Sequence, residues 1–390
     1  MEISQQNLKS LFNNYSLYKE DKLSGRYITS TDIENLLVRL SVNFDIETIG
    51  HSNNAIPIRK VIIGKGPIKI LAWSQMHGNE STTTKAIFDL LNALKDPSDD
   101  VILNSILKNI TLAIIPMLNP DGAEAYTRVN ANHIDLNRDA QDLTQIESRV
   151  LREEFEDFKP QYCFNLHDQR TVFSAGPKAN PATISFLTPS MDEIRSIKPS
   201  RIQSMKLIAT MANDLSAYLK GNIGRYDDLY NANCTGDTFQ GGNVPTILFE
   251  AGHYPHDYMR EETRRYIFLA LLSGLNAVVS KSYDEVEYEA YFRIPENEKL
   301  FYDVILRNAV IKDEVKDVAI QFKEVLHAGK IIFEPVVVKI QHKLAEYGHR
   351  EIECGNNKVT REGEEELIEN VIVDKIAIKS EILIINYENN

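Results

Sequence analysis

The part of the chain before Lys281 alternates between short apolar runs and longer segments with helical periodicity. The apolar runs predict strands at residues 44–49, 58–63, 68–73, 110–116, 162–166 and 246–250. Apolar residues spaced three or four apart predict helices at residues 29–40, 81–94, 145–158, 200–219 and 260–280. Strands that alternate with helices form a sheet that is covered on both faces. We therefore expect an α/β fold with a mixed twisted sheet and helices on both faces, whose ordered part begins with the helix at 29–40.

The pattern of the sequence changes after Lys281. Segments such as VEYEAYFRI, FYDVILRNAVI and KIIFEPVVVKI alternate apolar and polar residues with a period of two, and charged or Gly/Asn turns separate them. A single hydrophobic core seldom grows beyond roughly 250 to 300 residues. We therefore expect two domains in this chain of 390 residues, an α/β domain at 1–282 and a smaller β-rich C-terminal domain at 283–390.

The composition excludes several classes of partner. The chain has 43 Lys and Arg against 56 Asp and Glu, and its net charge of −13 opposes binding to nucleic acid or to an anionic membrane surface. Its most apolar long run, at 266–280, is shorter than the about 20 residues that span a bilayer. The three cysteines show no disulfide pattern, and no secretory signal is visible at the N-terminus. We expect a cytoplasmic protein with a peptide or small-molecule substrate; its oligomeric state stays open.

A histidine and a glutamate occupy the junction between a predicted strand and a predicted helix. In the stretch LAWSQMHGNESTTTK, His77 and Glu80 are three residues apart, with Gly78 between them. Open α/β sheets bind their ligands at the C-terminal ends of the strands, and both side chains can turn toward one point there. Two interpretations stay open for this pair: a two-ligand metal clamp, and a hydrogen-bonded pair at the surface.

Two further apolar runs end in residues that can act together with this pair. His167 ends the run FNLH and can supply a third ligand, although a single histidine is more commonly a buried, hydrogen-bonded one. Two histidines and one carboxylate, with the fourth position open to water, make up a hydrolytic zinc site. Glu250 ends the run TILFE, and such a site needs one free carboxylate as general base. We therefore predict one zinc ion, with Glu250 as the base.

A polar segment of unusual length separates these positions. The stretch LNPDGAEAYTRVNANHIDLNRD contains Arg128, Asn137 and Arg138, and loops of about 20 residues inside a compact domain are usually functional. Two guanidinium groups and an amide can bind carboxylate and oxyanion oxygens. The alternative is an ordinary solvated connection.

Several elements, in this order along the chain, resemble the zinc carboxypeptidase family, the M14 metallopeptidases: HGNE, NPDG, Arg128 with DLNRD, LHD, a tyrosine ahead of FEAG, and the glutamate of FEAG. The resemblance implies a promoted-water hydrolysis of the C-terminal peptide bond. It assigns the zinc ligands as His77, Glu80 and His167, the base as Glu250, the oxyanion-stabilising residue as Arg128 and the substrate-carboxylate clamp as Asn137 and Arg138.

The same resemblance implies a mobile tyrosine that closes over the substrate. Tyr230 matches this tyrosine, and Tyr226 is a second candidate nearby. Asp237 can either pair with a cationic substrate side chain or cap a turn, and we favour the turn. His253 and His256 are expected outside the set of metal ligands. Because no signal is visible, the chain looks similar to the intracellular bacterial members of the family, and the string TRVNANHIDLNRD is also similar to the murein-peptide amidase branch.

Two other functions stay open. The first is an N-acyl amino acid deacylase of the aspartoacylase or succinylglutamate desuccinylase type, which shares the HxxE and His ligands and a trailing β domain. The second is a catalytically silent metal-binding interaction protein. The NPDG motif, Tyr230 and the long polar loop argue against the deacylase. A competent residue at each catalytic position argues against the silent protein.

Overall fold

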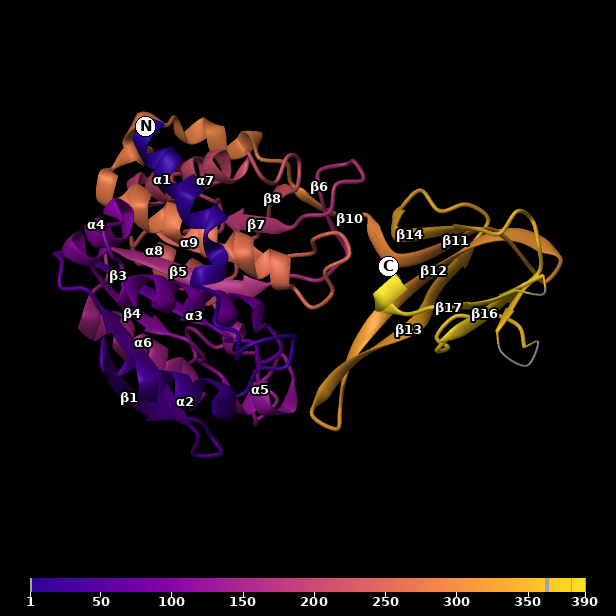
Figure 1. Ribbon diagram of the computed structural model, residues 1–390, viewed down its shortest axis with the longest axis horizontal. Coiled ribbons are helices and arrows are strands. Elements are labelled where there is room, and N and C mark those ends of the chain that lie inside the picture. Colours follow the sequence, from indigo (N-terminus) through magenta and orange to yellow (C-terminus); the bar gives the residue numbers. More distant parts are fainter. Residues whose placement is uncertain (1, 362–364, 380, 390) are drawn as a thin grey trace.

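The computed structural model describes residues 2–361, 365–379 and 381–389, and Figure 1 shows a large α/β body beside a smaller part made of strands. The body is built on an eight-stranded sheet of order β1-β2-β4-β3-β5-β9-β7-β8. Its strands are β1 (Asp45–His51), β2 (Pro57–Ile63), β3 (Ile68–Ser74), β4 (Ile110–Ile115), β5 (Tyr162–Asp168), β7 (Ile184–Leu187), β8 (Ile223–Arg225) and β9 (Thr246–Ala251). Strands β4, β3, β5 and β9 run parallel, whereas β1–β2, β2–β4 and β7–β9 are antiparallel pairs. The predicted mixed sheet is confirmed.

Helices cover both faces of this sheet. They are α1 (Glu2–Asn13), α2 (Ser30–Leu40), α3 (Thr82–Lys95), α4 (Val101–Asn109), α5 (Pro120–Ala125), α6 (Ile146–Phe158), α7 (Pro199–Leu215), α8 (Thr235–Gly241) and α9 (Glu261–Ser280). In β3, Ile70 packs into the same core as α3, α7 and α9, while Leu71 and Trp73 pack on the opposite face with residues of α6 and α8. The central strands are mostly apolar because both faces are buried. No helix in the described residues is both long and apolar enough to cross a membrane.

Two expectations about the ends of this body are wrong. The ordered part begins before residue 29, because α1 packs Leu8, Leu11 and Phe12 into the main core. The segment VEYEAYFRI, expected as a strand, forms the 3-10 helix η4 (Tyr288–Arg293), which follows η3 (Ser282–Glu285). Tyr291 is fully buried in the core of the α/β body. The alternating aromatic residues of η4 pack against α7 and do not pair with another strand in the described part of the chain.

The strands after residue 296 form the predicted β-rich part. A four-stranded sheet of order β13-β12-β11-β14 faces a three-stranded sheet of order β15-β16-β17, and the two share a separate hydrophobic core. The strands are β11 (Phe301–Ile311), β12 (Glu314–His327), β13 (Lys330–Gln341), β14 (Tyr347–Glu353), β15 (Val359–Arg361), β16 (Lys375–Ile378) and β17 (Glu381–Ile384). The division at 282/283 stays a prediction, and the packing of η3 and η4 on the first core favours a division nearer Leu300.

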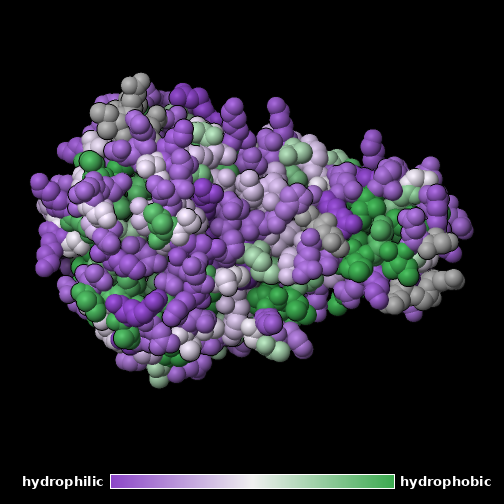
Figure 2. Space-filling view, viewed as in Figure 1, coloured by the Kyte–Doolittle hydropathy of each residue, from purple (hydrophilic) through white to green (hydrophobic). Residues whose placement is uncertain are grey.

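Polar contacts join the two parts. Arg26 forms an ion pair of 3.0 Å with Glu324 of β12, and the Tyr258 hydroxyl donates to Asp303 of β11 at 2.9 Å. Tyr258 itself packs in the β-rich core. A short ladder adds to these contacts, because β10 (Asn297–Lys299) pairs with β6 (Phe173–Ala175) of the α/β body. Figure 2 shows a largely hydrophilic surface on this face, with apolar residues scattered over the α/β body and grouped on the β-rich part.

The buried ion pair between Arg264 of α9 and Asp89 of α3 gives a stability prediction. Both side chains are 0% exposed, and Arg264 Nε donates to Asp89 Oδ2 at 2.7 Å. Removing Asp89 leaves the buried Arg264 with only the Glu261 carboxylate, at 3.3 Å, so Asp89→Ala is expected to lower the free energy of unfolding by about 3–5 kcal/mol. Urea unfolding measures this loss. Arg39→Ala, which breaks an exposed pair, should cost at most about 1 kcal/mol; equal losses in the two variants would contradict the assignment.

Buried His253 predicts a pH dependence of stability. The side chain packs against the rings of Tyr258 and His349, at centroid distances of 4.8 and 4.2 Å. Burial, and then the neighbouring His349, lower the pKa of His253 well below its ordinary value. The unfolded state therefore binds a proton that the folded state does not, and stability is lost as the pH falls below about 6.5.

The wild type is expected to lose unfolding free energy as the pH falls from about 6.5 to 5. In His253→Phe this loss should be smaller by about 2 kcal/mol. Urea unfolding at the two pH values measures the difference. The same replacement at His51, which is exposed, serves as control. A pH dependence that is the same in His253→Phe and wild type would show that this imidazole does not couple to folding.

Candidate metal centre and active site

His77 and Glu80 lie in the loop that joins β3 to α3, at the C-terminal ends of the central strands. This loop packs against the NPDG turn at the start of α5. Asn119 Oδ1 accepts a hydrogen bond from Gly122 N at 2.9 Å, and its Nδ2 donates at 3.1 Å to the carbonyl that precedes His77. A Cβ atom on Gly78 would lie 1.9 Å from the carbonyl carbon of Gly122, so only glycine fits there. The HGNE and NPDG motifs are therefore the two sides of one contact.

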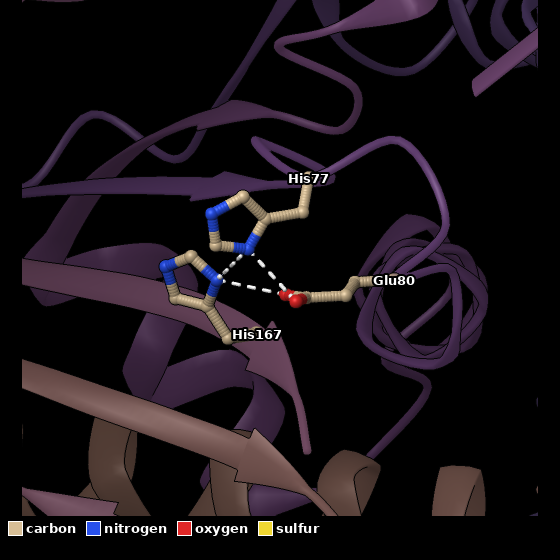
Figure 3. Close-up of side chains that lie close together, drawn as sticks. All are labelled: His77, Glu80 and His167. Atoms are coloured by element: carbon tan, nitrogen blue, oxygen red, sulfur yellow. Dashed lines mark hydrogen bonds and ion pairs between the residues drawn. The ribbon is translucent and has the colours of Figure 1, made fainter. Parts of the chain in front are cut away.

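His167, at the end of β5, completes a group of three candidate metal ligands whose side chains converge (Figure 3). His77 Nδ1 lies 2.8 Å from Glu80 Oε1, and His167 Nδ1 lies 2.8 Å from Glu80 Oε2 and 3.1 Å from His77 Nδ1. Zinc bonds of about 2.0–2.1 Å in a tetrahedron set neighbouring ligand atoms about 3.3 Å apart. Carboxylate oxygens and imidazole nitrogens that converge at this spacing, in a buried position, fit a zinc ion.

Glu250 lies beside this group on the neighbouring strand. It pairs in register with His167 across β5 and β9, and its Oε2 is buried without a hydrogen-bond partner among the described residues. Burial, and then the Glu80 carboxylate, raise the pKa of Glu250 well above its ordinary value, while Arg128 acts in the opposite direction. The carboxyl group is held next to the metal ligands with one oxygen free to exchange a proton.

Asp135 is a site residue that the sequence analysis did not assign. Its Oδ1 lies 3.1 Å from His77 Nε2, and its Oδ2 accepts a hydrogen bond from Arg128 Nε at 2.9 Å. A carboxylate on the outer nitrogen of a metal-binding histidine fixes the ring and raises its basicity. The first Asp of DLNRD was visible in the motif, but the sequence contains no sign of its contact with a residue 58 positions earlier.

Asn137 and Arg138 follow in the 3-10 helix η2 (Leu136–Arg138) and line the same cavity as the metal ligands. Asn137 Oδ1 accepts a hydrogen bond from Thr235 N at 3.0 Å, which leaves its amide N–H groups for another acceptor. Arg138 Nη1 donates to Asn137 O at 2.7 Å and to Cys234 Sγ at 3.0 Å. Arg138 has no carboxylate partner among the described residues, so its guanidinium can bind one from a ligand.

A cavity of about 760 Å³ opens over the metal ligands, and Tyr226 and Tyr230 both line it. Burial, and then the carboxylates of Glu250 and Glu80, raise the pKa of Tyr226. Both tyrosines therefore lie where a ligand in the cavity can contact them.

The remaining candidates occupy structural positions. Asp237 accepts hydrogen bonds from Ser190 N at 2.8 Å and Asn231 N at 3.0 Å, the turn-capping arrangement that we favoured. Burial raises its pKa to about 6. His253 packs against the β-rich part and His256 is exposed, and neither belongs to the metal-binding group found among the described residues.

The Asp135 contact predicts a measurable change in metal affinity. Asp135→Asn keeps the size of the side chain but weakens its hold on His77, so zinc affinity is expected to fall about 10- to 100-fold. Competition against a chromogenic chelator measures this. Asp157→Asn, an exposed change on α6, is the matched control. If both variants bind zinc as tightly as wild type, Asp135 does not support the metal site.

Comparisons with known proteins agree with this geometry. The family model described as "Zinc carboxypeptidase" matches residues 33–239. Carboxypeptidase SOL1 of Arabidopsis thaliana is 33% identical over 132 residues, which are 31% of this chain and 27% of that protein. Carboxypeptidase 2 of Trichophyton rubrum is 29% identical over 112 residues, which are 28% of this chain and 20% of that protein. The matches thus span about a quarter of these curated relatives.

Solved structures show the same fold. A metallo-carboxypeptidase from Burkholderia cenocepacia aligns with a TM-score of 0.51 at 16% identity, over 65% of this chain and 70% of that one. A metallo-carboxypeptidase from Pseudomonas aeruginosa, in complex with (2-guanidinoethylmercapto)succinic acid, aligns with a TM-score of 0.51 at 17% identity, over the same shares of 65% and 70%. Because the family model covers more than half of the chain, this protein belongs to the zinc carboxypeptidase family.

Proposed function

We propose that this protein is a zinc-dependent metallocarboxypeptidase that hydrolyses the C-terminal peptide bond of a peptide. The observation that supports this most directly is the convergence of His77, Glu80 and His167 on one point, with the free carboxylate of Glu250 on the adjacent strand. Three ligands with an open fourth position and a nearby base are the requirements of a hydrolytic zinc site. The arrangement lies in a cavity large enough for a peptide end.

His77, Glu80 and His167 would hold the zinc ion. When bound there, zinc lowers the pKa of a coordinated water and polarises a carbonyl group. Glu250 takes a proton from the attacking water and returns it to the leaving amine. Arg128 stabilises the negative charge that develops on the carbonyl oxygen. Its guanidinium lies 3.6 Å from Glu80 Oε1, so it already faces the ligand group.

Asn137 and Arg138 would bind the terminal carboxylate of the substrate. This role is supported by their place in the cavity and by the free donors described above. Recognition of a free carboxylate restricts hydrolysis to the last bond of a peptide. Tyr230 or Tyr226 would close over the terminal residue. The intracellular bacterial branch, the murein-peptide amidase branch and a cytoplasmic location stay predictions.

The alternatives differ in substrate. An N-acyl amino acid deacylase would need the same zinc ligands and base, but it would hydrolyse a small acylated amino acid rather than a peptide. A catalytically silent metal-binding protein would bind zinc without turnover. The cavity of about 760 Å³ has room for a peptide end, which favours the peptidase over the deacylase. The carboxylate of Glu250 beside the ligand group favours an enzyme over a silent protein.

The function is tested with the zinc-loaded protein and three substrate types: peptides with a free C-terminus, the same peptides amidated, and N-acylated amino acids. We expect hydrolysis of the free peptides, and a loss on amidation of about 10- to 100-fold in kcat/KM, because a charged hydrogen-bond acceptor is removed. Faster turnover of the acylated amino acids would identify a deacylase. No turnover of any substrate would identify a silent protein.

Glu250→Gln tests the base. This change removes the proton acceptor and preserves the size of the side chain, so kcat is expected to fall about 10²- to 10⁴-fold with zinc content unchanged. Glu153→Gln, an exposed change on α6, is the matched control. Retained zinc together with unchanged hydrolysis in Glu250→Gln would overturn the assignment.

A further inference from the structure

One wall of the active-site cavity comes from the segment that leads into the β-rich part. Lys299 of β10, and Phe301 and Tyr302 at the start of β11, line the cavity together with the metal ligands. In the ladder between β10 and β6, Lys299 pairs in register with Phe173, which also lines the cavity. Figure 1 shows β6 and β10 between the α/β body and the β-rich sheets. This wall lies outside residues 33–239, which carry the family match.

Hydrogen bonds hold this wall against the loop that follows His167. Asn297 Nδ2 donates to Gln169 Oε1 at 2.8 Å, and Asn297 Oδ1 accepts from Ser185 Oγ at 3.0 Å. A Cβ atom on Gly224 would lie 1.9 Å from Asn297 Oδ1, which shows how closely the segment is packed. Phe301 N adds a hydrogen bond of 3.1 Å to the carbonyl of the loop before β6. The wall is therefore a built part of the site.

Besides Arg138, two cations on the cavity lining lack a carboxylate partner among the described residues. Arg128 is paired with Asp135 and Glu80, and Arg138 is assigned to the terminal carboxylate of the substrate. Arg170 and Lys299 line the cavity but form no ion pair within the described part of the chain. Five carboxylates also line the cavity, and in the described residues none of them forms an ion pair with Arg170 or Lys299: Glu80, Asp168, Glu250, Asp237, which holds two backbone N–H groups, and Asp227, which accepts a hydrogen bond from Leu229 N at 3.0 Å.

The order of the strands places Lys299 across the metal ligands from the carboxylate clamp, and Arg170 between them, in the loop after β5. At this edge of the sheet the strands follow the order β4, β3, β5 and β9. The loop after β4 carries Arg138, and the loop after β3 carries His77. His167 lies on β5 and Glu250 on β9. Beyond β9 lie β7 and β8. At the end of β8, Arg225 forms a β-bridge with Glu296, the residue before β10, so the wall comes next in this order. A peptide with its terminal carboxylate on Arg138 would therefore extend toward Lys299 on the other side of the scissile bond.

We propose that Lys299 and Arg170 form a subsite for a carboxylate group on the substrate, located upstream of the scissile bond. The preferred substrates are then peptides with an acidic residue on the N-terminal side of the bond that is cut. This inference rests on the proposed peptidase function and adds a substrate class to it. It also gives the segment before the β-rich sheets a part in specificity. In a chain with a net charge of −13, two unpaired cations in one cavity supply local attraction for such a group.

The test compares peptides that differ only in the residue before the scissile bond, which is Glu, Gln or Lys, in the zinc-loaded protein. We expect wild type to prefer the Glu peptide over the Gln peptide by about threefold to tenfold in kcat/KM, the range of one or two partly exposed ion pairs. Lys299→Glu should abolish this preference and favour the Lys peptide instead. Arg170→Gln should reduce the preference about two- to fivefold. Lys330→Glu makes the same charge change at an exposed hairpin outside the cavity and should leave the ratio unchanged.

The outcomes separate the two proposals. Turnover of all three peptides with a Glu-to-Gln ratio that is the same in wild type, Lys299→Glu and Lys330→Glu overturns the subsite and leaves the peptidase function standing. Absence of turnover in wild type overturns the peptidase function and the subsite with it. A drop in the activity of Lys299→Glu on all three peptides equally would show a structural effect and would also overturn the subsite. A gain on the Lys peptide supports it, because misfolding cannot produce that gain.

Discussion

The arrangement of the site depends on one buried carboxylate, that of Glu80. Its side chain is 12% exposed, and it lies between the imidazoles of His77 and His167, which are 2% and 3% exposed. A buried charge is costly unless it is paired and hydrogen-bonded. The two rings and the backbone N–H of Asp168, at 3.1 Å, satisfy it. Because these groups come from β3, its following loop and β5, the two strands have to be parallel neighbours.

The same requirement organises the residues around the ligands. Asp135 orients the ring of His77, Arg128 joins Asp135 to Glu80, and Gly78 allows the NPDG turn to approach the ligand loop. Each contact lies at the C-terminal ends of the strands, where parallel strands leave their following loops free to converge. The cavity is closed by a segment from the other end of the chain, since β10 pairs with β6 immediately after the loop that follows His167. The candidate metal ligands and this wall of the cavity therefore come from different parts of the sequence.

Much of the α/β body could be predicted from local patterns. The bounds of β2, β3, β4, β5 and β9 agree with the apolar runs, because strands buried on both faces are continuously apolar. The pattern failed at the two ends of the body. In α1, Leu8, Leu11 and Phe12 contribute to the core, and many polar residues surround them. Around Tyr291, alternating aromatic and acidic residues imitate a strand, although the chain turns as a 3-10 helix and buries that tyrosine.

By itself, the sequence determined the types of residues at the site, their order and the α/β class, because motifs and hydrophobic periodicity are local properties of a chain. It could not determine that Asp135 contacts His77, or that Lys299 reaches the cavity of His167. Both contacts join positions that are far apart along the chain, and their distances are set by which strands become neighbours in the sheet. Only the packing of the whole chain decides this, because the entropy lost in ordering such segments is recovered through tertiary burial and pairing.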